Sequence, residues 1–133
     1  MGFLNNIYNT LTDAESRKIS KKLSYLLEEE FVYTYPDFTL EFLEKEIGAD
    51  KQLINRVLLK KYQQSFYELK RRLRVSFLGE MVKRSQDDTS LHDYSVLCGY
   101  SDHEAMLRDV KTETGLDFEE FCRYIKHVKE RSN

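Results

Sequence analysis

The sequence predicts an all-α fold in which tandem helix-turn-helix units are joined by a long linker helix, with an extra N-terminal helix. One proline and five glycines occur among 133 residues, while 33% of the residues are charged, as is typical of helical domains. Apolar residues recur at helical spacing along most of the chain. Gly48 and Gly99 each separate two short helical patterns, where glycine allows a sharp turn. The length fits a single compact unit.

The N-terminal region, residues 1–35, is predicted to contain one amphipathic helix. Met1 to Thr10 shows no clear period and is expected to be a loose lead-in, whereas Thr12 and Glu15 form a capping-box pattern that predicts a helix start. That helix is expected to end near Phe31. Residues 31–35 are aromatic and β-branched and precede Pro36, so we expect an extended connector, with a strand as the alternative. The inward positions of the helix are Ile19, Leu23, Leu26 and Leu27.

The first helix-turn-helix is predicted at about residues 39–62. Thr39 is a suitable N-cap for its first helix, Gly48 ends that helix, and Asp50 can cap the second. Helical spacing predicts an inner face made of Leu40, Leu43, Ile47, Ile54, Val57 and Leu58.

The outward face of the second of these helices is polar and basic. Gln52 and Asn55 can bond adenine through two hydrogen bonds, and Arg56 can bond guanine in the same way, so these side chains suit readout of the DNA major groove. Lys51, Lys60 and Lys61 suit phosphate contacts. The alternative is an ordinary solvated helix surface.

The linker helix is predicted at about residues 65–84, opened by the capping box of Ser65 and Glu68. Its predicted apolar side consists of Phe66, Leu69, Leu73, Phe77 and Met81. Its other side carries cations that could hold phosphates or simply be solvated: Lys70, Arg71, Arg72 and Arg74. Residues 85–90 have turn chemistry.

The same plan repeats at about residues 90–115. Ser90 and Asp102 are predicted N-caps, and Gly99 and Gly115 end the two helices. A final helix is predicted at about 117–131. The apolar positions expected to face inward are Leu91, Tyr94, Leu97 or Cys98, Met106, Leu107, Val110, Phe118, Phe121, Ile125 and Val128.

Charge is distributed unevenly although the net charge is only −2. Residues 48–84 hold ten basic and three acidic side chains, a net charge of +7, between segments of −4 (residues 1–47) and −5 (residues 85–133). A basic block between acidic ones would place a positive face on a nearly neutral molecule, which favours binding of phosphates.

Other classes of function find little support. No apolar run reaches about 18 residues and no signal peptide is apparent, so we expect a cytoplasmic protein without membrane insertion. Cys98 and Cys122 are expected to be free thiols, and His92, His103 and His127 share no metal-ligand spacing with them. We predict no cofactor, no metal and no enzymatic activity.

The order and spacing of three stretches resemble the DNA-binding domain of AraC-type (AraC/XylS) transcription regulators, with this chain as a divergent member. These stretches are TLEFLEKEIGADKQLINRVL, SFYELKRRLRV and SLHDYSVLCGYSDHEAMLRDVKTETGLDFEEF, and the resemblance covers roughly residues 36–124. The resemblance implies a domain of seven helices, made of residues 36–133 together with the helical lead-in before Pro36. Double-stranded DNA is the implied partner, RNA polymerase or a sensor domain is a further candidate, and a monomer is favoured.

The resemblance also implies site residues. Its groove-reading positions fall on Gln52, Asn55 and Arg56 in the first unit. In the second unit and the linker the corresponding positions are His103, Glu104, Arg108, Lys111 and Arg74. The chain departs from the family pattern at Glu44 and Leu78, where small residues are usual, at Gln63, where glycine is common, at Phe118, where proline is usual, and at Cys122, where arginine is usual.

The second reading helix is rich in carboxylates: Asp102, Glu104, Asp109 and Glu113 outnumber Arg108 and Lys111. Acidic side chains are repelled by phosphates. We therefore expect the first unit to be the main DNA anchor. The competing hypothesis is a degenerate helix-turn-helix protein that acts as a protein–protein interaction module, with Leu53, Leu59 and Leu107 partly exposed.

Overall fold

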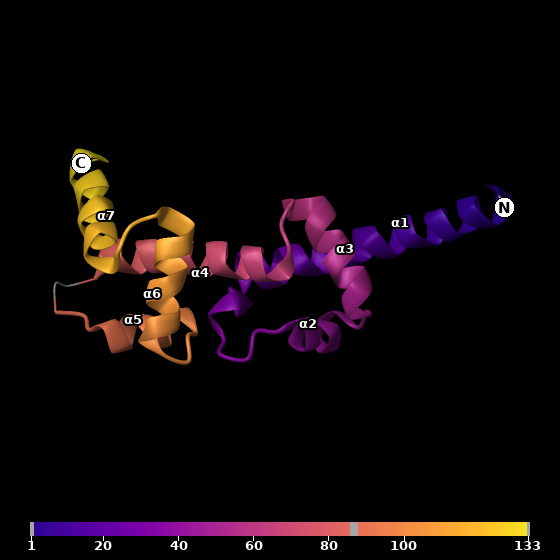
Figure 1. Ribbon diagram of the computed structural model, residues 1–133. Helices are drawn as coiled ribbons and strands as arrows, with labels where there is room; N and C mark the ends of the chain where they lie inside the picture. The colour runs from indigo at the N-terminus through magenta and orange to yellow at the C-terminus, as the bar shows by residue number, and fades with distance from the viewer. Residues whose placement is uncertain (1, 86–87, 133) are drawn as a thin grey trace. The chain divides into compact units, whose positions relative to one another are not determined.

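The computed structural model describes residues 2–85 and 88–132, and side chains within 13–85 and 88–131. All regular structure in these ranges is helical, which confirms the predicted class (Figure 1). The order is α1 (Gly2–Ser24), a π-helical turn (Tyr25–Glu29), a 3-10 turn (Val32–Thr34), α2 (Leu40–Ile47), α3 (Lys51–Tyr62), α4 (Phe66–Arg84), α5 (Leu91–Cys98), α6 (His103–Thr114) and α7 (Phe118–Ser132).

The chain forms two compact units, so the expectation of a single one is wrong. The first unit comprises residues 1–32 and 38–66, and the second comprises residues 33–37 and 67–133. The first therefore contains α1, α2 and α3. The second contains most of α4, all of α5, α6 and α7, and the short segment before Phe38.

The core of the first unit forms where α1 packs against α2 and α3. The predicted inward residues are all buried: Ile19 and Leu23 lie on α1, and Leu26 and Leu27 lie in the π-helical turn. Leu43 and Ile47 of α2 are buried as well. Ile54, Val57 and Leu58 bury the inner side of α3, as predicted. Each such aliphatic side chain contributes about 1.5–3 kcal/mol through its removal from water.

Two predictions for the N-terminal region are wrong. α1 begins at Gly2 instead of Thr12, because no proline or further glycine before Thr12 interrupts the helix. Residues 32–34 form a 3-10 turn instead of an extended connector or a strand. The expected helix end near Phe31 is confirmed, since the π-helical turn stops at Glu29 and Phe31 takes a positive φ of 51°.

Local hydrogen bonds define the first helix-turn-helix as predicted. Thr39 Oγ1 accepts from the amide of Phe42 at 3.0 Å, and Asp50 Oδ1 accepts from the amide of Gln52 at 2.8 Å. Each cap contributes about 1 kcal/mol. The unusual Glu44 has a purpose in this chain, because its Oε2 accepts from the amide of Lys51 at 3.1 Å and so satisfies a second amide at the start of α3.

The second unit has its core between α4 and the three helices that follow. Leu78, Cys98, Met106 and Val110 are completely buried in it. The predicted apolar side of α4 is wrong for its second half: Val75, Leu78 and Val82 form the buried side, whereas Phe77 and Met81 are only partly buried. The pattern was ambiguous because apolar residues occupy two sides of this helix.

The second helix-turn-helix is also capped as predicted. Ser90 Oγ accepts from the amide of Asp93 at 3.0 Å, and Asp102 Oδ1 accepts from the amide of Ala105 at 2.8 Å. Of the two alternatives at the end of α5, Cys98 is the buried residue and Leu97 is 49% exposed. The predicted turn at 85–90 includes residues 86 and 87, which lie outside the described ranges.

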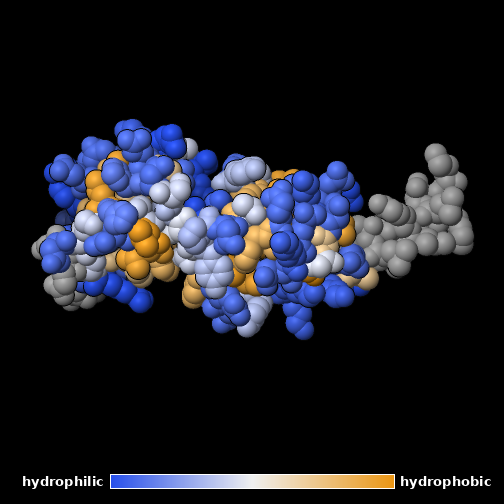
Figure 2. All heavy atoms as spheres, turned by 90° about the horizontal axis from the view of Figure 1, so that it is seen from below, coloured by the Kyte–Doolittle hydropathy of each residue, from blue (hydrophilic) through white to orange (hydrophobic). Residues whose placement is uncertain are grey.

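Hydrophilic side chains cover most of the face seen in Figure 2.

Candidate nucleic-acid interface

The first unit presents a basic helix with an accessible polar side. Lys51, Gln52, Arg56 and Lys60 are exposed on α3, and Asn55 is partly exposed. The helix contains four lysine or arginine residues and no carboxylate. Its outward side therefore combines hydrogen-bonding side chains with net positive charge.

The cations of α3 differ in how far they are engaged. Lys51 Nζ lies 3.6 Å from Glu41 Oε1, but both side chains are more than half exposed, so solvent screens the pair. Lys61 Nζ donates to Ser20 Oγ at 3.1 Å. Arg56 and Lys60 have no ion pair among the described residues. These two side chains are available to an anionic partner.

The second unit presents α6 with His103, Glu104, Arg108 and Lys111 exposed. Two of the carboxylates that made this helix look acidic are used inside the unit. Asp109 accepts from the Tyr100 hydroxyl at 2.8 Å, and Glu113 pairs with Arg71 at 3.0 Å. Along α6, the exposed side thus keeps Glu104 together with Arg108 and Lys111, so the count of carboxylates along the helix overstates the negative charge of that side.

Two of the predicted DNA contacts, Arg71 and Arg74, lie on α4 and have partners within the second unit. Arg74 is only 5% exposed and donates to the carbonyl oxygens of Tyr33 at 2.7 Å and Tyr35 at 2.9 Å. Arg71 is engaged by Glu113. Sequence spacing placed both on a solvated side of the helix, but their partners come from distant parts of the chain. Arg74 is therefore a structural residue of the second unit, whereas Arg71, whose side chain is 30% exposed, stays a predicted phosphate contact.

The surroundings of Arg74 explain how a buried cation is held. Its guanidinium lies 5.0 Å from the centre of the Tyr100 ring, an attractive cation–π arrangement. Burial lowers the pKa of Arg74, while Tyr100 and Asp109 act in the opposite direction. Burial, with the hydrogen bond to Asp109, raises the pKa of Tyr100. Burial also raises the pKa of the Cys98 thiol to about 12. At neutral pH the cluster keeps a charged Arg74 beside neutral Tyr100 and Cys98.

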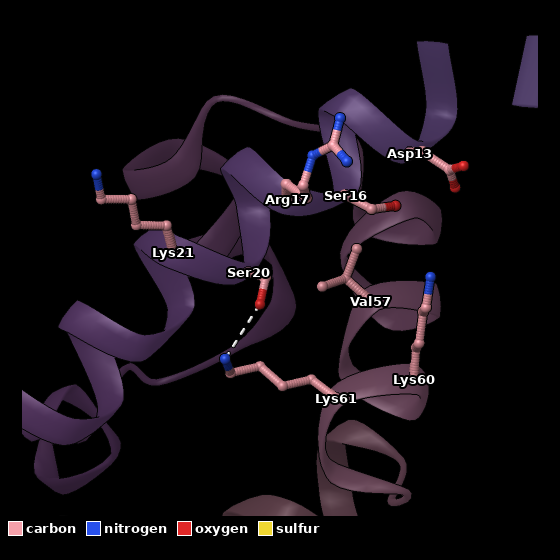
Figure 3. A pocket seen from close by; sticks show the side chains of 8 residues that line it. All are labelled: Asp13, Ser16, Arg17, Ser20, Lys21, Val57, Lys60 and Lys61. Atoms are coloured by element: carbon pink, nitrogen blue, oxygen red, sulfur yellow. Dashed lines mark hydrogen bonds between the residues drawn. The ribbon is translucent and has the colours of Figure 1, made fainter. Parts of the chain in front are cut away.

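Basic side chains on α1 form a further part of the positive surface that was not among the predicted site residues. Arg17 and Lys21 line a hollow that they share with Lys60 and Lys61 of α3 (Figure 3). The available signal was the i, i+4 spacing of Arg17 and Lys21, which places both on one side of α1. Within the described ranges, no three His, Cys, Asp or Glu side chains could jointly hold a metal ion, and no helix is sufficiently long and apolar to cross a membrane.

Comparison with known proteins defines the class of fold. No family model matches the sequence, and no curated protein matches it. Among solved structures, the chain is similar to the C-terminal domain of AraT, a response regulator from Geobacillus stearothermophilus, with a TM-score of 0.63 and 16% identity over 85% of this chain and 84% of that one.

A second solved structure is a transcriptional regulator from Chromobacterium violaceum, described among AraC-type DNA-binding domain-containing proteins. Its TM-score is 0.64 at 12% identity, over 87% of this chain and 96% of that one. At these identities the likeness shows the fold alone. The all-α, tandem helix-turn-helix chain therefore has the fold of an AraC-type DNA-binding domain, as the sequence resemblance predicted.

Proposed function

We propose that the chain binds double-stranded DNA sequence-specifically in transcription regulation. The main support is the outward side of α3, where Gln52, Asn55 and Arg56 accompany lysines on a helix without carboxylates. These side-chain types match the donors and acceptors that bases present in the major groove. The fold shared with the two regulator domains agrees with this function.

In the proposed mechanism α3 enters a major groove. Gln52, Asn55 and Arg56 contact base edges, while Lys51 and Lys60 contact phosphates and fix the register of the helix. Lys61, which donates a hydrogen bond to Ser20, contacts the phosphate backbone of the DNA from the side of α3. His103, Glu104, Arg108 and Lys111 of α6 form a second, weaker reading surface, because Glu104 opposes its two cations.

An interaction module is the alternative function. It is favoured by apolar side chains that are well exposed on short helices: Leu59 (54%), Val96 (58%) and Leu97 (49%). A protein partner such as RNA polymerase or a sensor domain would cover such side chains. This alternative requires no contact between α3 and DNA.

A titration of the purified chain with mixed genomic DNA, at low and at moderate salt, separates the two functions. DNA binding through lysine and arginine predicts affinity that falls steeply as salt rises. Selection from a random duplex pool then gives the preferred sequence. Absence of salt-dependent binding would overturn the proposal and favour the interaction module.

A further inference from the structure

A hollow of about 590 Å³ lies between α1 and α3 within the first unit. Four of the side chains that line it are basic, namely Arg17 and Lys21 from α1 with Lys60 and Lys61 from α3, and Asp13 is the single carboxylate among them. The positive charge of the hollow thus exceeds its negative charge by three. Such an arrangement is costly unless water, counterions or an anionic ligand screens it.

Apart from Asp13, the carboxylates of the first unit, including Glu15 of α1, do not line the hollow. Glu41 and Glu44 interact with Lys51 at the start of α3, and Glu28, Glu29 and Glu30 lie beyond the end of α1. Arg17, Lys21 and Lys60 have no ion pair within the described part of the chain. The excess positive charge of the hollow is therefore left uncompensated by the protein.

Hydroxyl groups complete the lining. Figure 3 shows Ser16 and Ser20 pointing from α1 towards α3, with Lys61 reaching across to Ser20, and Lys21 extending away from α3. A hydroxyl donor beside ammonium and guanidinium groups is the combination that binds the oxygens of a phosphate group. The hydrogen bond to Ser20 holds the Lys61 ammonium at the hollow.

We propose that this hollow is a phosphate-binding surface to which Arg17 of α1 contributes together with Lys60 and Lys61 of α3. The favoured source of the phosphate is the DNA backbone, because Lys60 belongs both to the hollow and to the helix proposed to enter the groove. That choice of source rests on the proposed function. α1 is then part of the binding surface as well as a packing element.

The first arm of the test measures affinity for a duplex over a series of KCl concentrations. Arg17→Ala removes the guanidinium and keeps a strong helix former, so α1 should persist. The matched control is Lys18→Ala, since Lys18 is an exposed cation one residue along α1 that does not line the hollow. Loss of one phosphate contact should weaken binding about threefold or more and reduce the magnitude of the salt slope by about 1. Lys18→Ala should leave the slope unchanged.

The second arm measures thermal unfolding without DNA, in pyrophosphate and in KCl of equal ionic strength. Stabilisation of the wild type by pyrophosphate that Arg17→Ala abolishes, with duplex binding unaffected, supports the site with a small phosphorylated molecule as its ligand. Equal behaviour of Arg17→Ala and Lys18→Ala in both arms would overturn the site. If the wild type binds no duplex, the proposed function fails. The unfolding measurement in pyrophosphate then still shows whether the hollow binds phosphate.

Discussion

Arg74 Nε donates a hydrogen bond of 2.7 Å to the carbonyl oxygen of Tyr33, forty-one residues away in the chain. With the second bond to Tyr35, it ties the middle of α4 to residues 33–37, which belong to the same compact unit. The planar guanidinium can serve two carbonyl groups at once while its face rests on the Tyr100 ring. The arginine that the family resemblance placed among the DNA contacts is therefore buried and bound within the second unit.

Replacement of Arg74 by alanine should lower the free energy of unfolding by about 2–4 kcal/mol, because it leaves two carbonyl groups without their donor and removes a buried cation. Arg74→Lys should recover only part of the loss, since a single ammonium cannot reproduce the guanidinium fork. Urea unfolding measures both effects. Arg84→Ala is the control on the same helix, where an exposed pair with Glu80 contributes little. Unchanged stability together with lost DNA binding in Arg74→Ala would restore the DNA role.

The two turn glycines should respond differently to alanine. Gly48 and Gly99 both take positive φ values, 76° and 88°, which disfavour any side chain. A Cβ at Gly48 would meet nothing within 4 Å, whereas at Gly99 it would lie 2.4 Å from the carbonyl oxygen of Thr34. Gly48→Ala should cost about 1 kcal/mol and Gly99→Ala about 3 kcal/mol or more, in unfolding measured by circular dichroism. Equal costs would mean that residues 33–37 yield easily to the new side chain.

Local chemistry made much of the fold predictable. Thr39, Asp50, Ser90 and Asp102 cap helices through amides only two or three residues away, so the short pattern contained the whole interaction. The start of α1 was missed because a capping-box pattern does not stop a helix that can continue upstream. The buried side of α4 was missed because its apolar residues allow two choices.

The site was less predictable for a different reason. The outward position of Gln52, Asn55 and Arg56 follows from the apolar spacing of Ile54, Val57 and Leu58 along the same helix. The partners of Asp109 and Glu113 cannot be predicted from spacing along one helix, since Glu113 pairs with Arg71, which lies 42 positions away in the chain. Net charge counted along a helix therefore misjudged the charge that α6 presents to solvent. The hollow between α1 and α3 could not be predicted either, because its lining residues come from helices far apart in the chain.

Stability should fall as pH rises above about 9. The folded state keeps the Cys98 proton up to a pKa of about 12, whereas the unfolded chain loses it near 9, so the unfolded state binds fewer protons between these values. One such group contributes a slope of at most about 1.4 kcal/mol per pH unit. Urea midpoints between pH 7.5 and 10, with a thiol reductant present, should decline, and Cys98→Ala should flatten that decline. Cys122→Ala, at a half-buried thiol, should flatten it less; an identical decline in Cys98→Ala would contradict the assignment.

Arg56 and Lys60 should separate base reading from phosphate contact, because both are exposed on α3 and neither has an ion pair within the described ranges. On a duplex selected from a random pool, Arg56→Ala should cost about 1–3 kcal/mol and relax base preference, while its effect on random duplexes stays small. Lys60→Ala should weaken binding to every sequence and reduce the magnitude of the salt slope by about 1. Arg108→Ala on α6 is the comparison, and its loss of affinity measures how much the second unit contributes to DNA binding. Equal losses on selected and random duplexes for Arg56→Ala would show that this side chain contacts phosphate and reads no base.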